Sequence, residues 1–464
     1  MGVQRNSPKT SPKKKATTLE DLFNLESRTK TSSNLSGKSF RTHLSVESEH
    51  EEVLSLISYC TFTYTFTDPS ESPSQQDQKR FKLAYLLSIL KSAKTPPHEE
   101  ILPPLFSMIS ANLFRPLSPS STSSSVICFL PDDEEVTATP VAAWPHLQIV
   151  YDILLRLIIN SDATTLQDYI DHSFLLNLLS LFQSEDPRER ESLKNVFHLI
   201  YSKFTLHRSF MRKAMNDVFL HYIFEMDRHG GIGELLEIWG SIINGFAVPL
   251  KQEHRVFLMR VLVPLHKPKG MQVYHRQLAY CVSQFVQKEP VLGGVVVRGI
   301  LKYWPVTNCQ KEVFLIGELE EIVENIDPEQ YRKLALPLCT QITKCLNSWN
   351  SQVAERALYV WNNEMFVRMA SHAMEEVFPV IVEGMEKNLN WHWSSSVRQL
   401  TENVKEMLEE MEPYLYSKCL EQLENEKSAA HQEEMKRKKK WERIEMAAAK
   451  NLFLQQPHVI CVSN

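Results

Sequence analysis

Three carboxylates, Glu318, Glu321 and Glu324, recur at a spacing that would place them on one face of a helix. General acid–base catalysis needs two carboxyl groups in contrasting environments, one kept protonated and one ionised. Three acids in one exposed stripe lack that contrast. The stripe therefore indicates a solvated surface or a docking patch for a basic partner rather than a catalytic centre.

Histidine and cysteine, the usual metal ligands and nucleophiles, are scattered. His392 lies between two tryptophans, which is more typical of a packed ring than of a ligand. Cys339 and Cys345 are the closest pair among eight cysteines, but five residues separate them and no histidine is nearby, so they fit a zinc site poorly. The pattern predicts reduced, packed thiols in a cytosolic or nuclear protein, with no metal bound.

Phosphate-binding and nucleophile motifs are missing from the sequence. It contains no GxGxxG, GxxxxGKS, GxSxG or HExxH pattern, and only 13 glycines in 464 residues. Residues 292–297 include two adjacent glycines without the spacing of a phosphate loop. We therefore expect no catalytic residues, no cofactor and no enzyme activity.

Charge and hydropathy point away from nucleic acid and membranes. The formal net charge is −5, and no apolar run approaches the roughly 18 residues of a membrane span. Basic runs at residues 13–15 and 435–440 fit a nuclear localisation signal as well as they fit solvated surface. We expect no nucleic-acid partner, no membrane, and a location in the cytoplasm and nucleus.

The elements expected to position side chains are helices in pairs. From residue 141 onward, apolar residues recur every three or four positions, and short breaks carry Pro, Gly or Asp. The first helix of each pair is expected to start at Pro145, Pro187, Gly231, Tyr274, Gln310, Ser351 and Trp391. A period near 40 residues is typical of HEAT and armadillo-like repeats, so we predict an all-α, curved solenoid.

Composition divides the chain into three parts. Residues 1–47, rich in Ser, Thr and Lys, predict a disordered tail. Residues 48–425 predict the HEAT-like helical solenoid, interrupted by a polar loop at about 115–140. Residues 426–464 predict a charged C-terminal helix and tail.

Eight sequence runs occur in a fixed order within about residues 55–451: residues 145–156, 184–194, 200–204, 233–254, 273–285, 301–305, 311–322 and 353–364. Together these runs resemble the B-prime family of regulatory subunits of protein phosphatase type 2A. The resemblance implies a non-catalytic solenoid that docks on a scaffold subunit and a catalytic subunit, forming a heterotrimer. It also implies recruitment of substrate proteins through a groove for short acidic Leu-x-x-Ile-x-Glu peptides.

The resemblance assigns eight positions to that groove: His198, Tyr201, Arg208, Glu237, Ile238, Ile242, Lys251 and His254. Ile238 and Ile242 are four residues apart, so with Tyr201 they are expected to floor a pocket for a branched side chain. Arg208, Lys251 and His254 would attract acidic residues of the ligand. Glu237 would orient a basic neighbour or cap a ligand amide.

Leu199 departs from the family pattern, which usually has arginine after the histidine. Loss of one charge-assisted contact costs on the order of 1.5–3 kcal/mol, roughly one to two decades in affinity, so peptide recruitment is expected to be weakened or altered.

Two alternatives to the regulatory subunit follow from the residues. One is a helical-repeat scaffold or transport adaptor not assembled with a phosphatase, although Trp239, Trp304 and Trp361 do not recur in the register of such a groove. The other is an enzyme on a helical scaffold, for which no convergent polar cluster is found.

Overall fold

The computed structural model describes residues 46–66, 68, 70–93, 96–117, 141–225, 228–305 and 307–454, with side chains from His50 to Lys450. The chain divides into two compact units, Met1–Glu52 and Val53–Asn464. Of the first unit, only the beginning of the first helix is described. The predicted tail (except residues 46–47), most of the predicted polar loop and residues 455–464 lie outside the described residues.

Nineteen α-helices account for most of the described residues, and short 3-10 turns and one π-helical turn link several of them. The helices are α2 (Val46–Thr61), α3 (Pro73–Ser92), α4 (Leu102–Leu113), α5 (Trp144–Asn160), α6 (Ala163–Leu166), α7 (His172–Ser180), α8 (Pro187–Lys203), α9 (Arg208–Glu225), α10 (Ile232–Asn244), α11 (Gln252–Phe257), α12 (His275–Lys288), α13 (Gly293–Lys302), α14 (Cys309–Val323), α15 (Pro328–Leu346), α16 (Ser351–Tyr359), α17 (Glu364–Ser371), α18 (Met374–Trp391), α19 (Ser395–Met411) and α20 (Pro413–Leu454).

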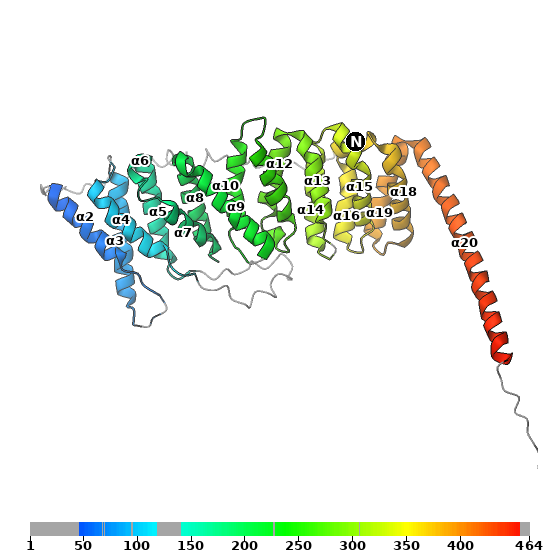
Figure 1. The fold of residues 1–464 in the computed structure, drawn as a ribbon, viewed down its shortest axis with the longest axis horizontal. Coiled ribbons are helices and arrows are strands. Elements are labelled where there is room, and N and C mark those ends of the chain that lie inside the picture. Colours follow the sequence, from blue (N-terminus) through cyan, green and yellow to red (C-terminus); the bar gives the residue numbers. More distant parts are fainter. Residues whose placement is uncertain are drawn as a thin grey trace, which may run out of the picture. The chain divides into compact units, whose positions relative to one another are not determined.

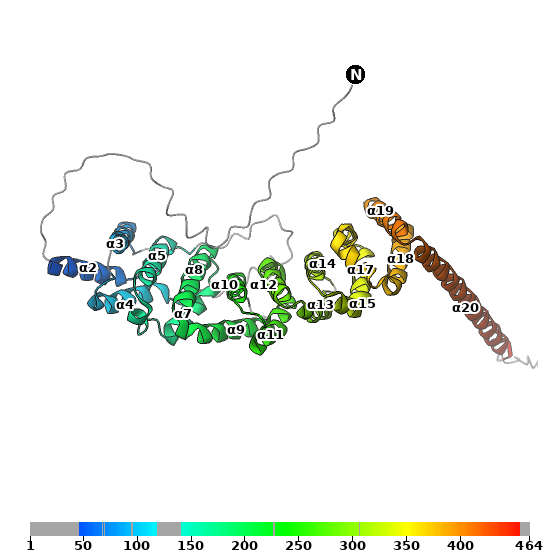
Figure 2. The same cartoon turned by 90° about the horizontal axis from the view of Figure 1, so that it is seen from above.

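The helices of the second unit stack in two layers (Figures 1 and 2). In one layer α3, α5, α8, α10, α12, α14, α16 and α19 each contact the next helix named. In the other layer α7 contacts α9. Farther along the chain α13 contacts α15, α15 contacts α18, and α18 contacts α20. Since the described residues contain no strand, the predicted all-α repeat solenoid is confirmed.

Capping residues mark three of the helix starts. Asp186, Asn308 and Asn350 each accept a backbone N–H from the first turn of the helix that follows, and Pro187 opens α8. Among the described residues, no side chain caps the first turn of α5, α10 or α12. All six helices, α5, α8, α10, α12, α14 and α16, begin within one residue of the predicted positions.

The last predicted start, Trp391, is wrong, because this residue ends α18. His392 Nδ1 accepts the N–H of Ser394 at 3.1 Å, and the Ser394 hydroxyl accepts the N–H of Val397 at 3.4 Å. These bonds define the break, and α19 begins at Ser395.

The final helix, α20, is continuous across residue 426, where we predicted the boundary between the solenoid and the charged C-terminal helix. Its beginning packs against α18 and α19, and Tyr416 and Cys419 are buried there. Every described side chain from Glu424 to Lys450 is exposed. Among the helices described, none combines the length and the hydropathy needed to cross a membrane.

Candidate binding pocket

A hollow of about 450 Å³ opens between two successive helix pairs, α8–α9 and α10–α11. Its lining residues are His198, Tyr201, Ser202, Arg208, Arg212, Ser241, Ile242, Gly245, Phe246, Ala247, Lys251, Glu253 and His254. Six of the eight predicted groove residues are therefore brought together: His198, Tyr201, Arg208, Ile242, Lys251 and His254.

The two remaining predicted residues do not line the hollow. Ile238 is 1% exposed and belongs to the core, because α10 is packed against both α8 and α12. Ile242, at 6% exposed, reaches the lining of the hollow, whereas Ile238 does not. Glu237 instead accepts hydrogen bonds from Lys194 Nζ at 2.5 Å and Gln277 Nε2 at 3.2 Å, so it orients a basic neighbour outside the pocket.

Two arginines at the start of α9 are held against the end of α8. Arg208 donates from Nε to the Tyr201 carbonyl at 2.9 Å and from Nη2 to the Ser202 carbonyl at 2.7 Å. Arg212 Nη1 donates to the Tyr201 hydroxyl at 3.0 Å. Arg212 was not among the predicted residues, although it lies four positions after Arg208 and hence on the same helical face.

The two histidines of the hollow are biased toward the neutral form. Burial lowers the pKa of His198, and the nearby Lys194 lowers it further. Burial also lowers the pKa of His254, with Lys251 adding to the effect and Glu253 opposing it. The positive charge of the hollow at neutral pH therefore comes from Arg208, Arg212 and Lys251, which suits a carboxylate ligand.

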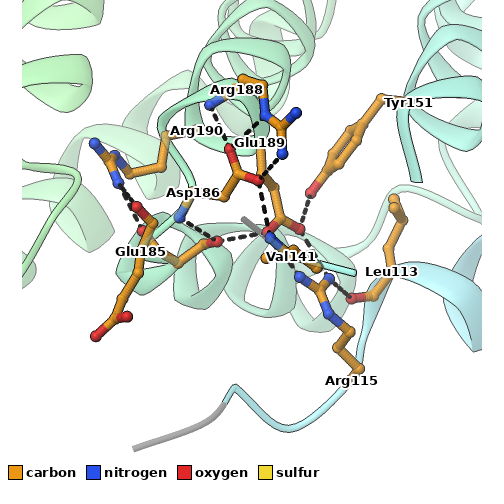
Figure 3. Close-up of polar contacts among 10 residues, drawn as sticks. Leu113, Arg115, Val141, Tyr151, Glu185, Asp186, Arg188, Glu189 and Arg190 are labelled. Carbon is orange, nitrogen blue, oxygen red and sulfur yellow. Dashed lines mark hydrogen bonds and ion pairs between the residues drawn. The ribbon is translucent and has the colours of Figure 1, made fainter. Parts of the chain in front are cut away.

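The N-terminus of α8 is fixed by a buried carboxylate (Figure 3). Arg115 donates through both terminal nitrogens to Glu189, at 2.8 and 2.7 Å. The same carboxylate accepts the Tyr151 hydroxyl at 3.1 Å and the Ser184 hydroxyl at 2.5 Å, and its side chain is fully buried. This cluster sets the position of the helix that carries His198 and Tyr201.

Contacts around α8 also connect it to its neighbours. Asp186 accepts the backbone N–H of Val141 at 3.1 Å, and Arg190 Nε donates to Glu234 of α10 at 2.7 Å (Figure 3 shows Asp186, Val141 and Arg190). At Gly231, just before α10, a Cβ would lie 2.5 Å from the carbonyl oxygen of Phe182, so only glycine allows this approach. The two helices that form the hollow are thus held in a defined relation.

The acidic stripe expected on α14 is not a single exposed face. Glu318 is 3% exposed and contacts His266 Nε2 at 3.0 Å and His275 Nε2 at 2.8 Å. Glu321 and Glu324 are exposed. The expectation of one solvated stripe is therefore wrong for Glu318, because two histidines distant in sequence pack against it.

The described cysteines are free thiols, and most of them are buried. Burial raises the pKa of Cys60 to about 11 and those of Cys339 and Cys345 to about 12, which leaves all three protonated at neutral pH. Cys128 and Cys461 lie outside the described residues. His392 is 6% exposed and donates from Nε2 to the Ser348 carbonyl at 3.0 Å, as a packed histidine would.

Comparison with known proteins gives one family. Residues 38–448 match the family described as "Protein phosphatase 2A regulatory B subunit (B56 family)". The B' beta isoform of the 57 kDa regulatory subunit of serine/threonine protein phosphatase 2A from Arabidopsis thaliana is 47% identical over 84% of this chain and 78% of its own length. The B' alpha isoform from the same plant is 45% identical over 87% of this chain and 82% of its own length. The B' kappa isoform from Oryza sativa subsp. japonica is 44% identical over 85% of this chain and 78% of its own length.

Proposed function

The chain belongs to the B56 family of protein phosphatase 2A regulatory B subunits, and from this membership we propose that it docks on the scaffold and catalytic subunits of the phosphatase and recruits substrates to them. The relatives are named as regulatory subunits, and the family is not a catalytic one. The substrate-binding element in this proposal is the hollow between α8–α9 and α10–α11.

The lining of the hollow supports the ligand class that we propose. Ile242 and the ring of Tyr201 offer apolar surface for a branched aliphatic side chain. Arg208, Arg212 and Lys251 bring three positive charges to the lining, against one negative charge from Glu253. A short peptide with a branched apolar residue followed closely by a carboxylate would satisfy both, which matches the pattern Leu-x-x-Ile-x-Glu.

The observation that carries the proposal is the convergence of six residues from separate helices and loops on one hollow. Arg208 and Arg212 are only partly buried and Lys251 is exposed, so all three cations can face a ligand in the hollow. Arg212 adds a guanidinium to the lining of the hollow, to which Leu199 contributes no charge.

Assembly is tested by mixing the purified chain with a preformed scaffold–catalytic dimer and separating the products by size exclusion. A stable ternary complex is expected at micromolar concentration. If the chain elutes alone, the regulatory role is refuted, and a free-standing scaffold or transport adaptor becomes the better hypothesis.

Peptide recruitment is tested separately by calorimetric titration of the chain with a Leu-x-x-Ile-x-Glu peptide. Replacing the ligand Ile by Ala, or Arg208 by Ala in the protein, is expected to weaken binding by roughly tenfold or more. Lys344→Ala serves as the protein control, because Lys344 is an exposed cation on α15, away from the hollow. Equal affinity of Arg208→Ala and Lys344→Ala would contradict the assignment.

A further inference from the structure

The far part of α20 carries exposed groups that the solenoid does not use. We define the distal segment as residues 435–446, which lie beyond the buried Tyr416 and Cys419. All its side chains are exposed, and Figure 1 shows the helix extending away from the stacked pairs. An isolated helix of this kind is open to a partner on every side.

Four of the six basic residues of the distal segment share one face, and Arg437 and Lys438 lie outside it. Six of its twelve residues are Lys or Arg and two are Glu. With 3.6 residues per turn, Lys436, Lys439, Lys440 and Arg443 fall within about a third of the circumference. Lys436 forms a pair with Glu433 at 2.8 Å, but both side chains are largely exposed, so that pair is weak. This face favours an anionic partner.

Large apolar residues occupy other faces of the same segment. Trp441 is 65% exposed and Ile444 is 58% exposed, and they lie three positions apart on a flank of the basic face, with Arg437 between them around the helix. Met435 and Met446, at 43% and 59% exposed, are eleven positions apart and form a second apolar line. The segment therefore exposes apolar surface in two directions as well as positive charge.

This distribution separates the possible anionic partners. A membrane surface contacts one side of an interfacial helix and would leave the second apolar line in water. Nucleic acid takes up the cations and can stack a base on Trp441, but it offers little to Ile444, Met435 and Met446. A protein groove that encloses the helix contacts all its faces, and an acidic rim complements the basic face.

We propose that the distal segment is a docking helix for an acidic protein with an apolar groove, of the kind that calcium-binding helix-pair proteins open when they load calcium. Methionine-rich grooves of this kind accommodate Trp and Ile anchors together with flanking basic residues. The interaction would give the regulatory subunit an input separate from its substrate hollow.

The test uses the full chain and calcium-loaded calmodulin as the probe, measured by isothermal titration calorimetry. A saturable 1:1 complex is expected in calcium and none in excess chelator. Trp441→Ala combined with Ile444→Ala is expected to lower affinity at least about 30-fold, as loss of buried anchors does. Alanine favours helix over both residues, so the helix is retained and circular dichroism should be unchanged.

Matched variants separate this docking from non-specific attraction. Trp391→Ala removes a tryptophan that is 79% exposed at the end of α18 and should leave binding unchanged. Lys439→Gln with Lys440→Gln should weaken binding, whereas Lys418→Gln with Lys427→Gln, also exposed on α20, should not.

Three results would each overturn the proposal. The first is an absence of binding at about 100 µM probe, a concentration chosen from the ~µM affinities of helix-in-groove complexes. The second is equal binding of the probe in excess chelator. The third is binding of the chain only to phosphatidylcholine vesicles that contain phosphatidylserine. The last result would assign the segment to a membrane surface.

Discussion

The ring of His254 lies flat against the ring of Phe246, with centroids 3.6 Å apart and an angle of 2° between their planes. Phe246 comes from the connection after α10, and His254 from α11. The stack fixes the imidazole at the edge of the hollow, and both residues line it. Position and charge of His254 are therefore set by different neighbours: Phe246 holds the ring, while burial and Lys251 lower its pKa.

Phe246→Leu should weaken binding of a Leu-x-x-Ile-x-Glu peptide. A ring pair contributes about 0.5–1.5 kcal/mol beyond its buried area, so a loss of roughly two- to twelvefold in affinity is expected by calorimetry. Phe210→Leu is the control, because it removes a similar stack with His172, at 3.9 Å and 12°, outside the hollow. Equal effects of the two variants would show that the Phe246 stack has no special role in binding.

Peptide affinity should rise as pH falls from 8 to 6. The pKa values of His198 and His254 are lowered in the free protein, so both rings are largely neutral at pH 7. A bound carboxylate favours the protonated rings and raises their pKa, which makes binding stronger as pH falls toward those values. Titrations at pH 6, 7 and 8 measure this, and a His198→Gln, His254→Gln double variant should flatten the profile. An affinity that falls toward pH 6 would contradict it.

Leu199→Arg should strengthen peptide binding. Leu199 is half-buried and packs against the core beside His198, so an arginine there would extend its guanidinium to the surface. One added charge-assisted contact predicts roughly a 10- to 100-fold gain in affinity. Leu199→Met controls for the change in packing and should leave affinity within about twofold. A Leu199→Arg chain that binds the peptide no more tightly than Leu199→Met would contradict this prediction.

Sequence patterns were sufficient for six of the seven predicted repeat starts, because short breaks in the apolar pattern lie beside those starts. Asp186 and Pro187 encode the beginning of α8 within two residues. The helix start predicted at Trp391 was wrong because the aromatic run around His392 continues the helical periodicity through a turn. That turn depends on the hydrogen bond of His392 to Ser348, 44 residues away in the other helix pair.

The candidate site was harder to predict from the sequence, because the exposure of a side chain depends on neighbours from other helices. The spacing of Ile238 and Ile242 puts them on one side of α10 but cannot show which of them α8 and α12 cover. Glu318 likewise looked solvated, since nothing near it in sequence reveals His266, which is 52 residues away. Arg212 could have been predicted as a lining residue, because its spacing of four from Arg208 places both on one helical face.

Glu189→Gln should destabilise the fold far more than Glu433→Gln. Glu189 accepts from Arg115 at 2.7 Å, and Glu433 accepts from Lys436 at 2.8 Å. The Glu189 side chain is fully buried, whereas that of Glu433 is 73% exposed. Breaking a buried pair costs about 3–5 kcal/mol, and an exposed helical pair contributes about 0.3–0.5 kcal/mol. Thermal melts by circular dichroism compare the two. Similar melting temperatures would rule out Glu189 as the anchor of α8.

The pair of His266 and Glu318 predicts a stability that depends on pH. His266 Nδ1 faces the Val263 carbonyl at 2.9 Å and Nε2 faces Glu318 at 3.0 Å, so both ring nitrogens donate and the imidazole is charged. Burial opposes that charge, but Glu318 raises the pKa of His266 above 6.5. Burial also opposes ionisation of Glu318, yet the two histidines lower its pKa to about 2.

The signs of these shifts locate the pH range in which the pair stabilises the fold. The Glu318 contribution is present above its ordinary pKa of 4.5 and is lost as pH falls toward 2, while the His266 contribution is present below 6.5 and is lost as pH rises through its folded pKa. Glu318→Gln should therefore lower the melting temperature most between about pH 4.5 and 6.5, with a smaller effect on either side. Glu321→Gln, one turn along α14 and exposed, should change it little at any pH. A Glu318→Gln deficit that does not vary from pH 4 to 9 would mean that the carboxylate acts as a neutral hydrogen-bond acceptor and that His266 is uncharged.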